Sequence, residues 1–186
     1  MVIFTDAEGK KRKGGRSPTG HLGFVVYHPK HGRVYAHAAV PASLTALLDE
    51  CRKRDTYIGQ YELTAAITPF ISLPASWFEG YQVELWVDNS GAMAALIKDY
   101  SGLPDCSRLV NMFHFAVAKL GLASLWIDYV ASESNPADVP SRAHELKGDD
   151  KLKLLSLGTE VPMTIPTFAT PDGRWLPMIE IAKSVW

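Results

Sequence analysis

The first forty residues carry the alternating and β-branched patterns that are typical of β-strands. Three segments show them: residues 2–7, 21–28 and 33–40. Residues 8–20, between the first two segments, are rich in glycine, lysine and arginine, so we expect a turn region there. Together the three segments predict an antiparallel meander of three strands.

Farther along the chain, helical spacing of apolar residues alternates with short apolar runs. Helices are predicted at residues 43–54 and 57–67, the second closed by Pro69. The mostly apolar run at 83–87, interrupted only by Glu84, predicts a buried central strand, and Ser90 can cap the helix after it. The remaining predicted elements are a helix at residues 105–120, a strand at 125–130, and a last helix that starts near 135 and extends through 144 or beyond.

Residues 147–186 differ from the rest of the chain in composition. They are charged at first and then rich in proline, with Trp175 and Trp186 as isolated aromatic residues. The chain has 186 residues and is 47% apolar, which is enough for one domain with a substantial core. We therefore expect a main domain at residues 1–146 and an extension at 147–186 that packs on it or leads to a further domain. The first strand has no lead-in, which suggests a domain cut from a longer polypeptide.

The net charge is −1, so binding to a nucleic acid would depend on local basic patches and not on a global field. The candidates are residues 10–13 with Arg16, and residues 52–54. Short basic runs of this kind are also common as solvated ends of loops and helices, and that interpretation stays open.

Cysteine content and hydropathy indicate the compartment. Cys51 and Cys106 do not suggest a disulfide framework or a zinc site, which favours reducing conditions. No apolar run approaches the roughly 20 residues that span a bilayer, and strand-like residues begin at Val2 where a signal peptide would lie. We therefore expect an intracellular protein, cytoplasmic or nuclear, with no membrane partner.

Four acidic residues lie at boundaries of the predicted elements: Asp6, Glu62, Asp88 and Asp138. Acids beside apolar strands are costly to bury unless something neutralises them. Several converging carboxylates suit hard divalent cations such as Mg²⁺, and two such ions about 4 Å apart are a known device for phosphodiester cleavage. The pattern predicts a metal-dependent nuclease.

Each acid also has a simpler interpretation. Asp88 could cap the following helix, Asp138 could be a first-turn acid that favours the helix dipole, and Glu62 could be a solvated helix residue. Asp6 is the hardest to explain in this way because its neighbours are strand-like. The order of all four along the chain is more specific than any one of them.

The motifs that contain the four acids are residues 4–7 (FTDA), 60–63 (QYEL), 87–92 (VDNSGA) and 135–142 (NPADVPSR). Together they resemble the ribonuclease H domain of retroelement reverse transcriptases of the LTR or DIRS type, a member of the ribonuclease H-like superfamily. The resemblance covers residues 1–144, and the fourth motif is especially similar to the retroelement version.

The resemblance implies an α/β fold of the ribonuclease H-like type. This fold has a five-stranded mixed sheet, with the first three strands antiparallel and helices on both faces. It also implies that Asp6, Glu62, Asp88 and Asp138 are catalytic residues that bind two Mg²⁺ or Mn²⁺ ions. The implied reaction is hydrolysis of the RNA strand of an RNA·DNA hybrid, with reverse transcriptase or other domains of a polyprotein as partners.

The chain departs from this family in two places. Many members have a histidine in the loop before the last acid, but residues 129–135 contain none, and Glu133 could substitute for it or be a solvated loop acid. The polar residues that precede the helical glutamate in some members are replaced here, although Gly59 and Gln60 could still reach a 2′-hydroxyl. The candidate nucleic-acid-binding residues are Lys11, Arg12, Lys13, Gly59, Gln60, Asn89 and Ser90.

Two alternative functions remain open. One is a DNA-directed nuclease of the same superfamily, such as a junction resolvase or an integrase core. The other is an inactive scaffold that binds nucleic acid. The fourth motif argues against the first, and the four intact acids argue against the second.

Overall fold

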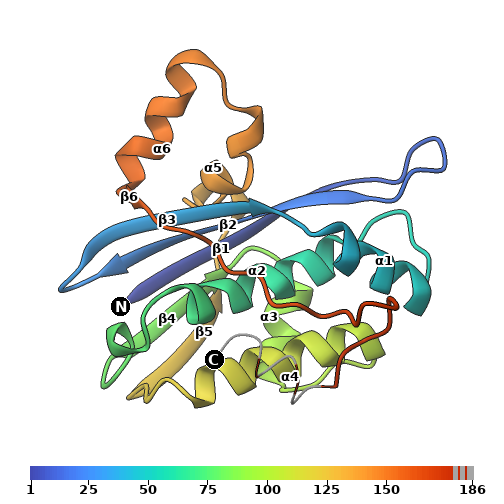
Figure 1. Cartoon of the computed structure of the whole chain (residues 1–186). Helices are drawn as coiled ribbons and strands as arrows, with labels where there is room; N and C mark the ends of the chain where they lie inside the picture. Colours follow the sequence, from blue (N-terminus) through green and yellow to red (C-terminus); the bar gives the residue numbers. More distant parts are fainter. Residues whose placement is uncertain (178–179, 181–182, 184–186) are drawn as a thin grey trace.

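The chain forms one mixed sheet of six strands in the order β5-β4-β1-β2-β3-β6 (Figure 1). The computed structural model describes residues 1–177, 180 and 183. The strands are β1 (Val2–Lys10), β2 (Thr19–His28), β3 (Gly32–Ala39), β4 (Gln82–Val87), β5 (Ser124–Tyr129) and β6 (Thr159–Glu160). No helix within these described residues is long and apolar enough to cross a membrane.

The strand directions confirm the predicted fold class. β1, β2 and β3 form the antiparallel meander, and β4 and β5 run parallel to β1. The sixth strand was not predicted: β6 comes from the expected extension and pairs with β3 through two residues. The parallel β1–β4 pair brings the side chains that follow the paired segments to one place.

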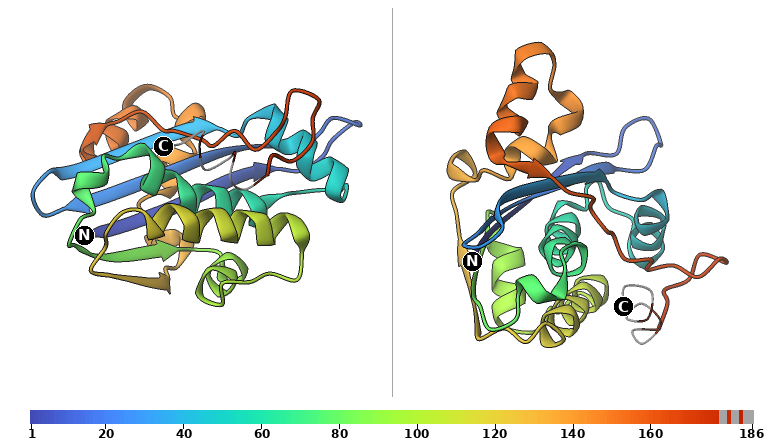
Figure 2. Two further views of the ribbon diagram at one scale, coloured as in Figure 1. Left: turned by 60° about the horizontal axis from the view of Figure 1, so that its bottom comes forward. Right: turned by 60° about the vertical axis from the view of Figure 1, so that its left-hand side comes forward.

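Helices cover both faces of the sheet, as predicted (Figure 2). They are α1 (Ala42–Cys51), α2 (Ile58–Ser72), α3 (Ser90–Ile97), α4 (Pro104–Ala118), α5 (Asp138–Ser141) and α6 (Lys151–Leu157). Single 3₁₀ turns lie at Ala75–Trp77, Ser132–Ser134, Ala143–Glu145 and Gly148–Asp150. In the right-hand view of Figure 2, α5 and α6 lie on one side of the sheet and α1, α2 and α4 on the other.

The main core lies between the sheet and α2 and α4. Phe24 and Leu85 from the strands are fully buried, as are Phe70 of α2 and Phe113 of α4. Full burial of each such side chain stabilises the fold by about 1.5–3 kcal/mol. α2 is buried along most of its length, so it is held firmly across the sheet.

α2 continues past Pro69 to Ser72, so the prediction that Pro69 closes this helix is wrong. Proline has no N–H to donate to the carbonyl four residues earlier, which here belongs to Ala65. The hydroxyl of Thr68 donates to that carbonyl instead, over 2.8 Å. The lost backbone bond is thus replaced, and the helix continues.

Three other boundaries differ from the prediction. The strands β1 and β2 extend well into the expected turn region, so their hairpin connects residues 10 and 19. α1 ends at Cys51 because Arg52 is extended, which leaves residues 52–54 outside the helix. The last predicted helix, α5, is only four residues long, since the backbone leaves helical geometry at Arg142.

The segment after β6 runs from the β3 edge of the sheet across α2 toward α1 (Figures 1 and 2). The amide of Thr164 donates to Ser72 Oγ over 2.8 Å, and Trp175 Nε1 donates to Cys51 Sγ over 3.1 Å. Phe168 is buried with the main core. The predicted domain boundary at 146/147 stays a prediction, and Trp186 lies outside the described residues.

Candidate active site

The site begins where β1 and β4 stop pairing. The last pair in their parallel register is Thr5 with Val87, so Asp6 and Asp88 occupy the next position on each segment. α2 packs against β1 and contributes Glu62. One oxygen from each of Asp6, Glu62 and Asp88 lies within 4.8 Å of the others. The structure therefore brings three of the four predicted acids into one cluster.

Two of the three carboxylates are withdrawn from water, and Asp88 is half-buried. Asp6 is 4% exposed and Glu62 is 3% exposed. Burial, together with the negative charges of Asp88 and Asp138, raises the pKa of Asp6 to about 7, against the opposing hydrogen bond from Ser141. Burial also raises the pKa of Glu62 well above its ordinary value, with the charges of Asp6 and Asp88 adding to the effect. This arrangement disfavours three negative charges at once.

One oxygen of Glu62 shows what the cluster lacks. Glu62 Oε2 is buried and has no hydrogen-bond partner among the described residues. A buried polar atom without a partner is costly, and a carboxylate oxygen is the ligand that hard divalent cations prefer. The residues therefore fit a Mg²⁺ or Mn²⁺ centre, because a cation would supply the missing partner and offset the repulsion.

The segment that follows β5 holds Asp6 in place through hydrogen bonds to its side chain and to the neighbouring backbone. Ser141 Oγ donates a hydrogen bond to Asp6 Oδ2, and Asn135 Nδ2 donates to the Thr5 carbonyl over 3.0 Å. Gly23 lies opposite Asp6 on β2, where an added Cβ would lie 2.4 Å from the Ser141 nitrogen. Glycine is therefore required for α5 to approach β2 this closely. The sequence analysis did not single out Ser141, although it lies within the fourth motif.

Asp138 lies at the rim of the cluster and not inside it. Its side chain is 40% exposed, and its Oδ1 accepts a hydrogen bond from Arg142 Nε over 2.6 Å. Its charge still raises the pKa of Asp6, so the two carboxylates are near one another. The structure thus separates the four predicted acids into a group of three and a partner that is paired with arginine.

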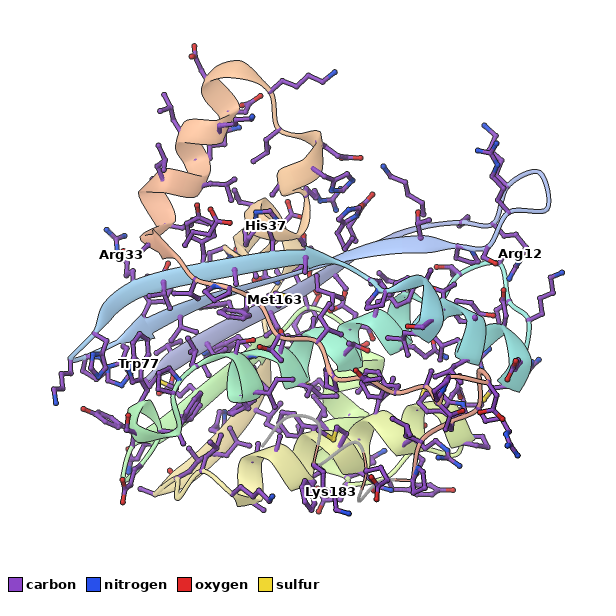
Figure 3. All side chains as sticks on the ribbon, viewed as in Figure 1. Arg12, Arg33, His37, Trp77, Met163 and Lys183 are labelled. Carbon is purple, nitrogen blue, oxygen red and sulfur yellow. The ribbon has the colours of Figure 1, made fainter. Side chains whose placement is uncertain are left out.

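The basic hairpin tip contains two kinds of side chain. Lys11 and Lys13 are exposed. Arg12 instead pairs with Asp49 of α1, and its Nε donates to the Arg54 carbonyl over 3.2 Å. Figure 3 labels Arg12 below the hairpin tip, beside the loop that follows α1. Arg12 therefore holds the loop after α1 in place.

The predicted contacts before Glu62 have defined partners as well. Gln60 is buried, and its Nε2 donates to Asp105 Oδ2 over 2.8 Å. Arg54 pairs with the same carboxylate at 3.3 Å. Gly59 lies in the first turn of α2, and nothing lies within 4 Å of a Cβ added there. The backbone at Gly59 is therefore open to a close approach, whereas the Gln60 amide is already engaged.

Two depressions adjoin on this side of the molecule. The larger, of about 680 Å³, is lined by Arg12, Arg52, Lys53 and Arg54, among others. The smaller, of about 240 Å³, is lined by residues that include Arg54, Gly59, Gln60 and Asn89. Arg54 lines both, so a basic surface continues to the residues that flank Glu62 and Asp88.

The start of α3 differs from the prediction. Asn89 caps this helix, since its Oδ1 accepts a hydrogen bond from the Ala92 amide over 3.0 Å, and the prediction that Ser90 is the cap is wrong. Ser90 is the first helical residue and is exposed. Glu133, the suggested substitute for the missing loop histidine, is exposed on the 3₁₀ turn at Ser132–Ser134.

Comparisons by sequence and by structure give different results. No family model matches the sequence, and no curated protein matches it. Among solved structures, ribonuclease H1 of the archaeon Halobacterium salinarum is similar at a TM-score of 0.54 and 18% identity, over 78% of this chain and 98% of that one. The N-terminal ribonuclease H domain of a Mycobacterium tuberculosis protein, solved as a fusion with maltose-binding protein, gives a TM-score of 0.53 and 14% identity, over 84% and 99%.

A third solved structure is LC9-RNase H1, described as a type 1 ribonuclease H with the type 2 active-site motif. It gives a TM-score of 0.54 and 12% identity, over 88% of this chain and 87% of that one. Identities this low establish a common fold and leave the activity to be argued from the site. By architecture and by these comparisons, the chain has the ribonuclease H-like fold.

Proposed function

We propose that the chain is a metal-dependent endoribonuclease that hydrolyses the RNA strand of RNA·DNA hybrids. The observation that carries the proposal is the cluster of Asp6, Glu62 and Asp88, just beyond the paired segments of β1 and β4, in a ribonuclease H-like fold. These three residues would hold Mg²⁺ or Mn²⁺, two ions in all, and Asp138 would join them from the rim when it releases Arg142.

Bound cations would activate a water and stabilise the leaving oxygen of the phosphodiester. The chain's own residues prepare the place for this. Ser141 fixes one oxygen of Asp6, α2 fixes Glu62 with one oxygen left unpartnered, and burial keeps bulk water from screening the charges. Arg142 holds Asp138 in reach of the cluster without burying it.

The adjoining depressions support a nucleic-acid substrate. Arg52, Lys53 and Arg54 present positive charge to phosphates, and Lys11 and Lys13 extend it along the hairpin. The open backbone at Gly59 would let the wide minor groove of a hybrid, with its 2′-hydroxyls, lie against α2. Gln60, Asn89 and Ser90 would flank this contact, with the Gln60 amide oriented by Asp105.

The four motifs further support a place in a retroelement reverse transcriptase. In this proposal residues 1–146 form the nuclease module, and the reverse transcriptase or other polyprotein domains are its partners. The segment after residue 146 crosses the helices that support Glu62, so it would brace the site.

The test is incubation of the purified protein with labelled RNA·DNA hybrid, duplex DNA and single-stranded RNA, with Mg²⁺, with Mn²⁺ and with chelator. We expect metal-dependent cutting of the RNA strand in the hybrid only. Equal cutting of duplex DNA would indicate a DNA-directed nuclease, and no cutting of any substrate by folded protein would indicate a scaffold. Asp128→Asn, which alters a β5 aspartate outside the cluster, is the matched control for Asp88→Asn.

A further inference from the structure

A second group of metal-ligating side chains lies two residues farther along β1. It consists of Glu8, His21 and His144, and one ligand atom of each lies within 4.8 Å of the other two. Glu8 and His21 are direct partners in the antiparallel register of β1 and β2. His144 comes from the 3₁₀ turn at Ala143–Glu145, which follows α5. Three separate segments therefore supply one group.

The distances within this group match those of a metal site. Glu8 Oε2 lies 3.6 Å from His21 Nδ1 and 3.3 Å from His144 Nε2. Ligands that bind zinc tetrahedrally at about 2.0–2.1 Å lie about 3.3–3.4 Å from one another. The carboxylate oxygen is thus spaced from His144 Nε2 as an ion would require, and it lies slightly farther from His21 Nδ1.

The carboxylate oxygen at the centre of the group has two histidine nitrogens at ion-pair distance but no hydrogen bond from any described residue. The Glu8 side chain is 11% exposed, and its buried Oε2 makes no hydrogen bond to any described residue. Both histidine nitrogens are near it, yet neither donates to it, and the two rings stack on one another with their centres 3.5 Å apart. A buried carboxylate oxygen without a hydrogen bond is costly unless positive charge, from a protonated imidazole or a bound cation, lies against it.

A cationic side chain already lies beside the group. Lys10 Nζ is 2.8 Å from Glu145 Oε1, 3.4 Å from His144 Nε2 and 3.8 Å from Glu8 Oε1. The Lys10 side chain is 53% exposed, so it can turn into solvent and leave these donors free. The alternative interpretation is an ion-pair network that ties the 3₁₀ turn to the hairpin and binds no metal.

We propose that Glu8, His21 and His144 bind one borderline divalent cation of the zinc class, separate from the carboxylate cluster. Two imidazoles and one carboxylate suit such an ion, whereas the all-oxygen group suits Mg²⁺ or Mn²⁺. The rings lie within 10° of parallel, so the His144 ring would turn to direct its Nε2 at the ion. Glu145 Oε1, 3.7 Å from that nitrogen, or a water would complete the coordination.

The ion would fasten the 3₁₀ turn to the β1–β2 hairpin. The turn directly follows α5, which carries Ser141, the donor to Asp6. The bound cation would therefore steady the segment that supports Asp6, and its binding does not depend on whether the protein cleaves RNA.

The test is titration of Zn²⁺ by calorimetry and of Co²⁺ by visible absorption, both in excess Mg²⁺ so that the carboxylate cluster is saturated. We expect one equivalent to bind both the wild type and Asp88→Asn. His21→Ala and His144→Ala should weaken binding at least tenfold. His114→Ala removes another histidine paired with a carboxylate, Asp99 at 2.7 Å, and should leave binding unchanged.

Lys10→Ala separates the two interpretations, and as an exposed position it should not prevent folding. The metal site predicts that Zn²⁺ binds this variant several-fold more tightly than the wild type, because a competing cation is gone. Zn²⁺ at ten times its Kd should also raise the Tm of the wild type by roughly 3–6 °C, and not that of His21→Ala. Equal Zn²⁺ affinity of the wild type, His21→Ala and Lys10→Ala would overturn the proposal in favour of the ion-pair network.

Discussion

β1 carries two clusters of ligand-type side chains that differ in what neutralises them. At Asp6 the neighbours are Glu62 and Asp88, so the cluster contains three carboxylates. At Glu8 the neighbours are two histidines and Lys10, with the exposed Glu145 beyond them, so the buried carboxylate faces potential positive charge. Both carboxylates of β1 are largely buried and only two residues apart. The neighbouring side chains, and not β1 itself, therefore decide which cation each cluster suits.

Arg142 lies within reach of both clusters. Its hydrogen bond to Asp138 raises its pKa, and the charges of Asp6 and Glu8 add to that effect. Arg142 therefore supplies positive charge near the all-carboxylate cluster but is directly paired only with Asp138 at the rim. The three-carboxylate cluster remains the less neutralised of the two.

The largest expected difference between the clusters is in catalysis. Asp88→Asn keeps the shape of the side chain and removes the charge that would hold the metal. Loss of about 4 kcal/mol of transition-state stabilisation corresponds to about a thousandfold loss of rate. His21→Asn changes the second cluster and should retain most of the activity. Single-turnover cleavage of a labelled hybrid in Mg²⁺ measures both, and binding assays should show that Asp88→Asn keeps its affinity, since phosphate contacts dominate it.

If Asp88→Asn cleaves the hybrid at the wild-type rate, the carboxylate cluster is not the active site. If His21→Asn loses as much activity as Asp88→Asn, both clusters are needed for catalysis and they are not functionally separate.

The next effect is on the pH dependence of stability without metal. The folded-state pKa of Asp6 is raised from 3.8 to about 7 by burial, so the folded state binds the proton more tightly than the unfolded state. The contribution of Asp6 to the free energy of unfolding is therefore full below its ordinary pKa and falls as pH rises from about 4 to 7. This loss is up to about 4 kcal/mol for Asp6 alone. The raised pKa of Glu62 acts in the same direction.

His21 acts in the opposite direction. Burial, and then the charge of His144, lowers its pKa from 6.5, so its contribution is lost as pH falls below that value. Urea melts in chelator across this range should show the net fall for wild type and a flatter profile for Asp6→Asn. A wild-type profile that rises from pH 4 to 7 would mean that the carboxylates are ionised without strain.

A smaller effect is expected from Mg²⁺ on thermal stability. A cation that binds only the folded state at ten times its Kd stabilises it by about 1.4 kcal/mol, or roughly 3–6 °C in Tm. Asp6→Asn relieves repulsion and keeps an oxygen to accept from Ser141, so without metal it should melt no lower than wild type. It should also lose most of the response to Mg²⁺, whereas Glu8→Gln should keep it. Thermal melts in chelator and in excess Mg²⁺ measure all three proteins.

An Asp6→Asn variant that melts lower in chelator and still responds fully to Mg²⁺ would show that Asp6 is structural. The ion that stabilises the fold would then bind elsewhere.

The smallest effect belongs to the hairpin tip, which lies beyond both clusters at the end of β1. Lys11→Ala and Lys13→Ala should each lower the slope of log affinity against log salt by up to about 0.9 if the side chain contacts a phosphate. Arg12→Ala should instead lower the Tm, because it leaves Asp49 without its ion pair. Filter binding across a salt series and thermal melts separate the two outcomes, and unchanged slopes for both lysine variants would mean that the tip does not bind nucleic acid.

Local patterns in the sequence determined much of this fold. Alternation at residues 2–7 and the apolar run at 83–87 predicted β1 and β4, whose pairing stops just before Asp6 and Asp88. Helical spacing around Glu62 predicted α2, which is buried along the sheet. Periodicity succeeds here because burial of one face is imposed along each element. The expectation that proline ends a helix failed at Pro69, where the hydroxyl of Thr68 replaced the lost hydrogen bond.

Only the tertiary structure decided how the chemistry is grouped. The length of the hairpin placed Glu8 opposite His21, and the turn after α5 added His144 from more than a hundred residues away. The same packing provided the Ser141 donor to Asp6, and it added β6 to the sheet. A periodic pattern reports which face of an element is buried, but it holds no information about which distant side chain will lie across from it. Those pairings depend on how the elements pack, because each contact is made only when strands and turns far apart in sequence are brought together.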